Sequence, residues 1–120
     1  MKQLTKAEEE VMQILWKMGE GVIKDILKGF KTKQPAYNTV ATVLKVLKSK
    51  EVVDFKAVGN TYVYFPLVTK EEYSSYQMKH LLQNYFGGSF ARLAAFFAKD
   101  NDMSLDDLES MLKESESKKR

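Results

Sequence analysis

The sequence predicts a mainly α-helical protein with one small β-hairpin. A hydroxyl residue stands three positions before an acidic residue at Thr5, Thr69 and Ser104. This spacing is typical of a helix N-terminus, because the two side chains cap each other's backbone N–H groups. Apolar residues recur at helical intervals through most of the chain, and the period changes to two between residues 52 and 65.

The composition narrows the classes of function. The 120 residues are 44% hydrophobic and 29% charged, which suits a globular protein. The chain has no cysteine and one histidine, which excludes disulfides, thiolate chemistry and multi-histidine metal sites. No apolar run approaches the roughly 20 residues that span a membrane, and the N-terminus does not resemble a signal peptide. We therefore expect a cytoplasmic protein without cofactor or metal, and no nucleophile–base pair or phosphate loop indicates an enzyme.

Three helices are predicted in the first part of the chain. The first follows Thr5 and ends at Gly19, because glycine favours the end of a helix. The second covers residues 23–30. The third covers residues 37–50 and begins after Pro35, which breaks the chain.

The third helix is two-faced. At about 100° per residue, its apolar residues fall on one side; they are Val40, Val43, Leu44 and Leu47. The opposite side is polar; it holds Asn38, Thr42, Lys45 and Ser49. This outer side has no acidic residue, although most surface helices mix both signs of charge.

A β-hairpin follows the third helix. Residues 52–58 and 61–65 are rich in β-branched and aromatic residues and flank Gly59-Asn60, which indicates a tight turn or a slightly longer loop. Three helices followed by a hairpin is the order of a winged helix-turn-helix domain. We predict this domain over residues 1–68.

Residues 69–120 are predicted to form a helical dimerisation domain. Helices are expected over residues 70–85, from residue 90 to 98, and from residue 105 onward. Three helices of this size bury few side chains alone, so their many apolar residues indicate an oligomer interface. The predicted interface residues are Leu81, Leu82, Leu93, Phe96, Phe97, Leu105, Leu108, Met111 and Leu112.

The charge distribution indicates an anionic partner for the first part of the chain. Residues 28–56 hold seven lysines and two acidic residues, as expected for a surface that meets a polyanion. Asparagine pairs with adenine, threonine contacts a thymine methyl group or a phosphate, and lysine reaches guanine or phosphate. The predicted DNA contacts are Tyr37, Asn38, Thr39, Thr42, Lys45, Lys56 and Asn60. The alternatives are a solvated lysine-rich surface, a winged helix that binds another protein, and a regulator that responds to a small molecule.

Three segments resemble the penicillinase-repressor family, the BlaI/MecI/CopY group of bacterial transcriptional regulators. Leu4–Trp16 has the acid-rich start, Val-Met pair and closing Leu-Trp of that family's first helix. Asn38–Leu47 is similar to its recognition helix, and Gly59–Pro66 is similar to its wing. Family wings often carry arginine after the turn glycine, where this chain has Asn60, so Lys56 is the stronger candidate for a wing contact.

The resemblance implies a homodimeric repressor of the kind that regulates antibiotic resistance, bound to a pseudo-palindromic operator. In the β-lactamase branch, a membrane sensor-protease triggers cleavage within the C-terminal helices, typically between Asn and Phe. The matching bond here is Phe96–Phe97, where Phe96 replaces the asparagine. In the copper branch a cysteine cluster binds metal, and this chain has no cysteine.

Overall fold

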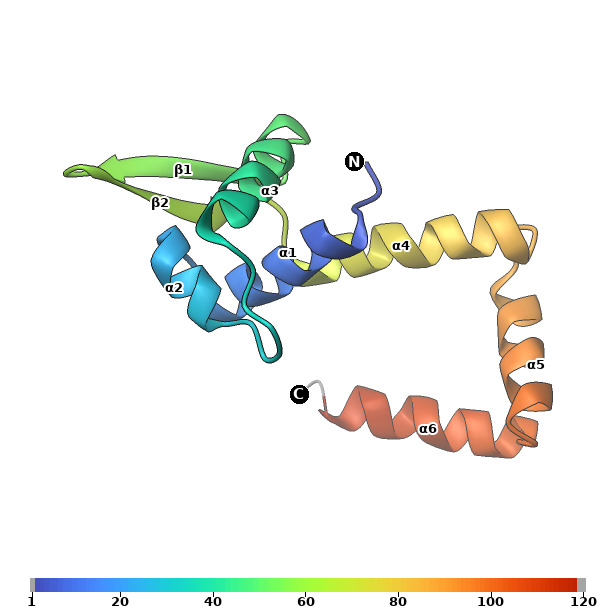
Figure 1. Cartoon of the computed structure of the whole chain (residues 1–120). Coiled ribbons are helices and arrows are strands. Elements are labelled where there is room, and N and C mark those ends of the chain that lie inside the picture. Colours follow the sequence, from blue (N-terminus) through green and yellow to red (C-terminus); the bar gives the residue numbers. More distant parts are fainter. Residues whose placement is uncertain (1, 119–120) are drawn as a thin grey trace. The chain divides into compact units, whose positions relative to one another are not determined.

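The computed structural model describes residues 2–118, and within that range it describes all side chains except those of Leu105 and residues 115–118. The elements are α1 (Lys6–Met18), α2 (Ile23–Lys28), α3 (Tyr37–Ser49), β1 (Val53–Val58), β2 (Thr61–Pro66), α4 (Lys70–Tyr85), α5 (Phe90–Asp100) and α6 (Leu105–Lys118) (Figure 1). The predicted fold class is confirmed. The chain divides into two compact units, residues 1–77 and 78–120. Within residues 2–118, no helix combines the length and the apolar character needed to cross a membrane.

All three predicted helix caps form reciprocal hydrogen bonds. Glu8 N donates to Thr5 Oγ1 and Thr5 N donates to Glu8 Oε1, both at 3.2 Å. The same pair of bonds joins Thr69 with Glu72 and Ser104 with Asp107. The starts of α1, α4 and α6 are therefore decided locally, by side chains three residues apart.

The hairpin has the shortest of the expected loops. Val58 pairs with Thr61, so Gly59 and Asn60 alone form the turn. Gly59 has a φ of 64°, whereas Asn60 has a negative φ. A positive φ at the first turn residue only is the pattern of a type II′ turn, which requires glycine at that position.

A third backbone segment joins the hairpin. Gly21 N donates to Tyr64 O at 2.9 Å and Tyr64 N donates to Gly21 O at 2.8 Å. Gly21 is buried, and a Cβ there would lie 2.3 Å from Met18 Cε. Gly21 follows the predicted end of the first helix by two residues. The structure shows that Gly21 fastens β2 to the segment between α1 and α2.

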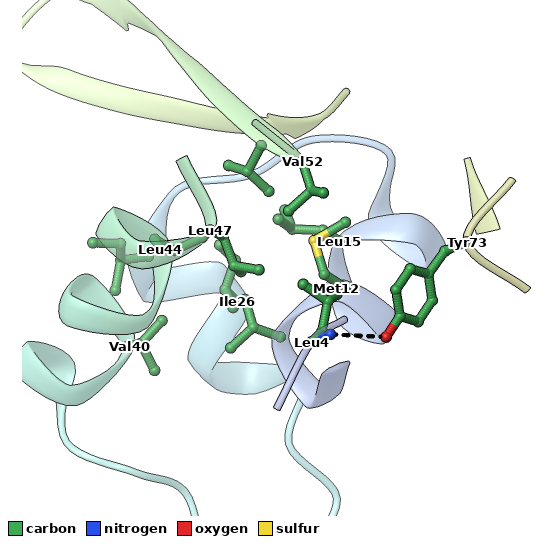
Figure 2. Close-up of a cluster of buried hydrophobic side chains, with 12 residues drawn as sticks. Leu4, Met12, Leu15, Ile26, Val40, Leu44, Leu47, Val52 and Tyr73 are labelled. Atoms are coloured by element: carbon green, nitrogen blue, oxygen red, sulfur yellow. Dashed lines mark hydrogen bonds between the residues drawn. The ribbon is translucent and has the colours of Figure 1, made fainter. Parts of the chain in front are cut away.

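The core of the first unit lies where α1, α2, α3 and β1 meet (Figure 2). Its fully buried side chains are Val11, Met12, Leu15, Ile26, Val40, Leu44, Leu47, Val52 and Val53. Tyr73 of α4 is also buried, and its hydroxyl accepts a hydrogen bond from Leu4 N at 3.1 Å. The core thus includes the first turn of α4 and extends beyond residue 68.

The second unit has little core of its own. Among residues 78–118 whose side chains are described, only Ala98 is buried. The rings of Phe86 and Phe96 pack together with centroids 5.6 Å apart. Most of the other apolar side chains of α5 and α6 remain accessible to solvent.

Candidate nucleic-acid interface

Burial of one side of α3 turns its polar side toward solvent. Val40, Leu44 and Leu47 are at most 1% exposed and Val43 is partly buried against the same core, which confirms the predicted inner face. The outer face consists of exposed residues; they are Asn38, Thr39, Thr42 and Lys45. No acidic residue occurs anywhere in Tyr37–Ser49, so no fixed negative charge on this helix opposes an approaching phosphate.

Hydrogen bonding leaves this face available to a ligand. Thr42 Oγ1 donates to Asn38 O at 2.9 Å within the helix. The methyl group of Thr42 and an oxygen lone pair therefore remain for outside contacts. Lys45 pairs with no acidic group among the described residues, so its ammonium is free to bind phosphate or guanine.

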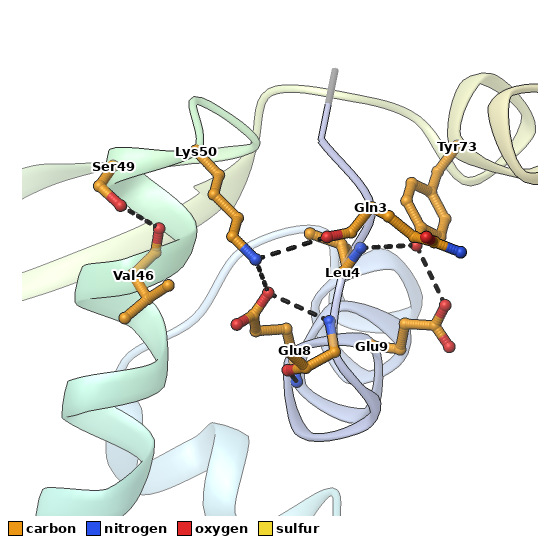
Figure 3. A network of polar contacts seen from close by, with 9 residues as sticks. Gln3, Leu4, Glu8, Glu9, Val46, Ser49, Lys50 and Tyr73 are labelled. Atoms are coloured by element: carbon orange, nitrogen blue, oxygen red, sulfur yellow. Dashed lines mark hydrogen bonds and ion pairs between the residues drawn. The ribbon is translucent and has the colours of Figure 1, made fainter.

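The C-terminal end of α3 is anchored to α1 by a shielded ion pair (Figure 3). Lys50 Nζ donates to Glu8 Oε1, and the two side chains are 19% and 9% exposed. Burial by itself would raise the pKa of Glu8, but hydrogen bonds from Lys50 and Thr5 outweigh burial and hold this pKa below its ordinary value. The sequence did not predict this pair, which joins the C-terminal end of α3 to the start of α1.

A second contact joins α3 to the hairpin. Lys48 Nζ lies 3.9 Å from Asp54 Oδ1 and 5.4 Å from the centroid of the Phe55 ring. Phe55 in turn packs against Tyr62 and Tyr64, with centroids 4.3 and 5.6 Å apart. Tyr62 and Tyr64 therefore brace the wing through Phe55.

The two predicted wing residues differ in their surroundings. Asn60 is exposed at the turn. Lys56 Nζ lies 3.1 Å from Glu20 Oε1, and both side chains are about half exposed. An exposed pair of this kind contributes little to stability, so Lys56 can exchange Glu20 for a phosphate at low cost.

A groove runs between the start of α3 and the wing and brings two predicted residues together, Tyr37 and Asn60. Its lining comprises Val22, Ile23, Lys24, Tyr37, Asn60, Thr61, Tyr62 and Tyr64. Burial, with smaller effects of the nearby phenols of Tyr37 and Tyr62, raises the pKa of Tyr64. The groove thus presents phenol hydroxyls beside one lysine. Sequence reasoning missed Lys24, because no local signal links α2 to the wing.

The residues predicted for the dimer interface are largely accessible. Leu81, Phe96, Phe97, Met111 and Leu112 are exposed, and Leu82, Leu93 and Leu108 are half-buried. The side chain of Leu105 lies outside the described residues. These apolar surfaces lie on the described helices of the second unit.

Comparison with known proteins agrees with this architecture. The family model of the penicillinase repressors matches residues 4–116. The chain is 24% identical to the penicillinase repressor of Bacillus licheniformis over 122 residues, covering 98% of this chain and 95% of that protein. It is 24% identical to the methicillin resistance regulatory protein MecI of Staphylococcus aureus (strain N315) over 110 residues, covering 91% and 89%.

A solved structure matches the first unit. The solution structure of the DNA-binding domain of the repressor BlaI superimposes with a TM-score of 0.52 and 29% sequence identity, covering 59% of this chain and 88% of that domain. The order of helices and hairpin is therefore that of a winged helix. With a family match that spans both units, the chain belongs to the penicillinase repressor family of transcriptional repressors.

Proposed function

We propose that this protein represses transcription by binding a pseudo-palindromic operator as a homodimer. The observation that carries the proposal is the exposed, acid-free face of α3 beside the wing. Asn38, Thr39 and Thr42 read base edges in the major groove, whereas Tyr37, Lys45 and Lys56 bind phosphates. Asn60 lies at the wing tip near the DNA backbone. The protein is a non-enzymatic regulator that works in the cytoplasm, where the operator is.

The exposed apolar side chains of the second unit support the homodimer. Ala98 is the one buried residue among its described side chains, while Phe96, Phe97 and Leu112 are exposed. Apolar surface of this extent favours burial against a second copy. The dimer interface would include all nine predicted residues. A two-fold dimer places its recognition helices one DNA turn apart or a multiple of it, roughly 34–36 Å per turn.

Release from the operator would follow proteolysis of the Phe96–Phe97 bond, in response to a membrane sensor-protease pathway. Both residues are exposed within α5, at 58% and 42%. Cleavage there would separate α6 from the rest of the chain. A peptide bond within a helix becomes accessible to a protease only after the helix opens locally. The second unit buries few of its described side chains, so this opening costs little free energy and favours the bond as a target.

A selection from random duplexes tests the operator proposal. Full-length protein is used to enrich binding sequences from a pool of random DNA duplexes. The affinity of the protein for the enriched duplexes is then measured at several salt concentrations. We expect a pseudo-palindromic consensus and an affinity that falls as salt rises, because bound phosphates release counterions. A pool without enrichment, together with salt-independent binding, would instead favour a protein-interaction module.

A further inference from the structure

A second groove lies on the first unit, away from the outer face of α3. It is formed by α1, the connection from α2 to α3 and the connection from β2 to α4. Its volume is about 720 Å³, which is the size of a small-molecule site. None of the residues predicted to bind DNA lines it.

Part of the lining of this groove is apolar. Ile14, Trp16, Leu67 and Val68 contribute to its lining. Trp16 Nε1 donates to Val68 O at 2.8 Å, so the indole N–H is already satisfied and Trp16 offers a ligand its apolar ring. Leu67 is 50% exposed, so its side chain is accessible to a ligand in the groove and would gain from being covered.

The lining of the groove also carries an excess of positive charge. It includes Lys17, Lys31 and Lys70 together with one acidic residue, Glu71. None of these four side chains forms an ion pair with another described residue. Three unpaired ammonium groups beside one carboxylate attract an anion.

We propose that this groove binds a small organic carboxylate with an apolar body. The hydrocarbon part would cover Leu67 and the Trp16 ring, and the carboxylate would lie among Lys17, Lys31 and Lys70. The volume favours a small molecule over a folded segment, and the charge favours an anion over a neutral lipid. This inference does not depend on the operator proposal, because the groove shares no residue with the DNA face.

The indole N–H of Trp16 gives a direct test, because the chain has one tryptophan. Full-length ¹⁵N-labelled protein is titrated with octanoate while the single indole resonance is followed. Octanol and acetate are the matched controls, since each keeps one half of the proposed ligand. We expect a saturable shift with octanoate and binding weaker by on the order of tenfold for either control.

Two variants locate the site. Replacing Lys17, Lys31 and Lys70 together by glutamine should lower the affinity for octanoate to that for octanol. Leu67→Ser should lower the affinities for octanoate and octanol by similar factors. A control with Lys28, Lys79 and Lys113 replaced by glutamine should bind octanoate normally. Equal binding of octanol and octanoate, or no shift at all, would overturn the proposal. So would a triple variant that binds octanoate normally and loses affinity for duplex DNA, because the lysines would then serve phosphates.

Discussion

The polar residues of α3 differ in what their neighbours leave them free to do. Asn38 and Thr39 are exposed, and their side chains make no hydrogen bond with another described residue. The hydroxyl of Thr42 donates its hydrogen bond to Asn38 O, and the ammonium group of Lys45 forms no ion pair with another described residue. Base reading is therefore expected at the start of the helix and phosphate binding further along it.

Replacing Asn38 and Thr42 by alanine should reduce discrimination between the operator and unrelated DNA. Loss of each good base contact costs about 1–3 kcal/mol of specificity. Lys45→Ala should weaken binding to all DNA sequences by a similar factor. It should also reduce, by about one, the slope of the logarithm of the binding constant against the logarithm of the salt concentration. Titration of operator and scrambled duplexes measures both effects, with Lys113→Ala as the control outside the DNA face. Unchanged operator selection by the double variant would show that this face does not read bases.

The ion pair between Glu8 and Lys50 makes stability depend on pH. The pKa of Glu8 is lowered from 4.5 in the folded protein, so the pair stabilises the fold above about pH 4.5, and this contribution is lost as pH falls through the lowered pKa. Lys50→Met should cost about 1–3 kcal/mol at neutral pH. Urea unfolding between pH 3 and 7 checks this.

Lys28→Met is the matched control for this experiment, because Lys28 pairs with Asp25 across 3.7 Å in solvent. That change should cost less than about 1 kcal/mol. Glu8→Gln should flatten the pH dependence below about pH 4.5. If Glu8→Gln and the original protein lose stability in parallel over this range, the lowered pKa is not coupled to folding.

Among the elements, α3 has an unusual C-terminal end. Val52 N donates to Leu47 O and Glu51 N donates to Lys48 O, at 3.2 and 3.0 Å, which is the Schellman arrangement. Its left-handed position is usually glycine, but here it is Glu51, with a φ of 63°. The end of α3 therefore carries backbone strain.

Glu51→Gly should stabilise the protein by about 1 kcal/mol, because glycine adopts this φ without a Cβ clash. Glu51 is exposed, so no packing is lost with its side chain. The control is Lys45→Gly, which places glycine at an exposed position inside the same helix and should destabilise by roughly 0.5–1 kcal/mol. Denaturant midpoints of both variants give the comparison. A lower midpoint for Glu51→Gly would contradict the strain argument.

For the whole molecule, the extent of the first unit decides which fragment folds. The core takes in Tyr73, whose hydroxyl accepts from Leu4 N and donates to Glu9 Oε1. A fragment of residues 1–77 should be folded and monomeric, while one ending at Thr69 should be less stable by about 3–5 kcal/mol through loss of a buried aromatic side chain. Thermal unfolding compares the two fragments.

Sedimentation of the 1–77 fragment and the full chain tests the dimer. The full chain should sediment as a dimer at micromolar concentration. A monomeric full chain would remove the proposed role of the second unit. The predicted domain boundary at residues 68 and 69 remains a prediction, and the stability of the two fragments tests it.

Cleavage at Phe96–Phe97 should abolish tight operator binding without any change in α3. A dimer makes its second DNA contact intramolecular, and loss of that linkage costs a factor of about 10²–10⁴ in affinity. A specific protease site engineered at this bond allows operator binding to be measured before and after digestion. The control carries the same site after Arg120. Tight binding by the cut protein would show that dimer integrity is not the switch.

Local order was predictable from the sequence. The capping pairs of α1, α4 and α6 and both ends of α4 lie at the predicted positions. The inner face of α3 and the hairpin were also predicted correctly. Each of these features depends on residues within about four positions of one another, or on a repeating period, so the sequence order alone contains the signal.

The tertiary structure decided how these elements meet. Lys50 pairs with Glu8, 42 positions away, and Lys56 pairs with Glu20, 36 positions away. The bridge from Gly21 to Tyr64 and the groove around Trp16 likewise join segments that are distant in the chain. No local period encodes such contacts, because they form only when helices fixed by their own sequences pack around a shared core.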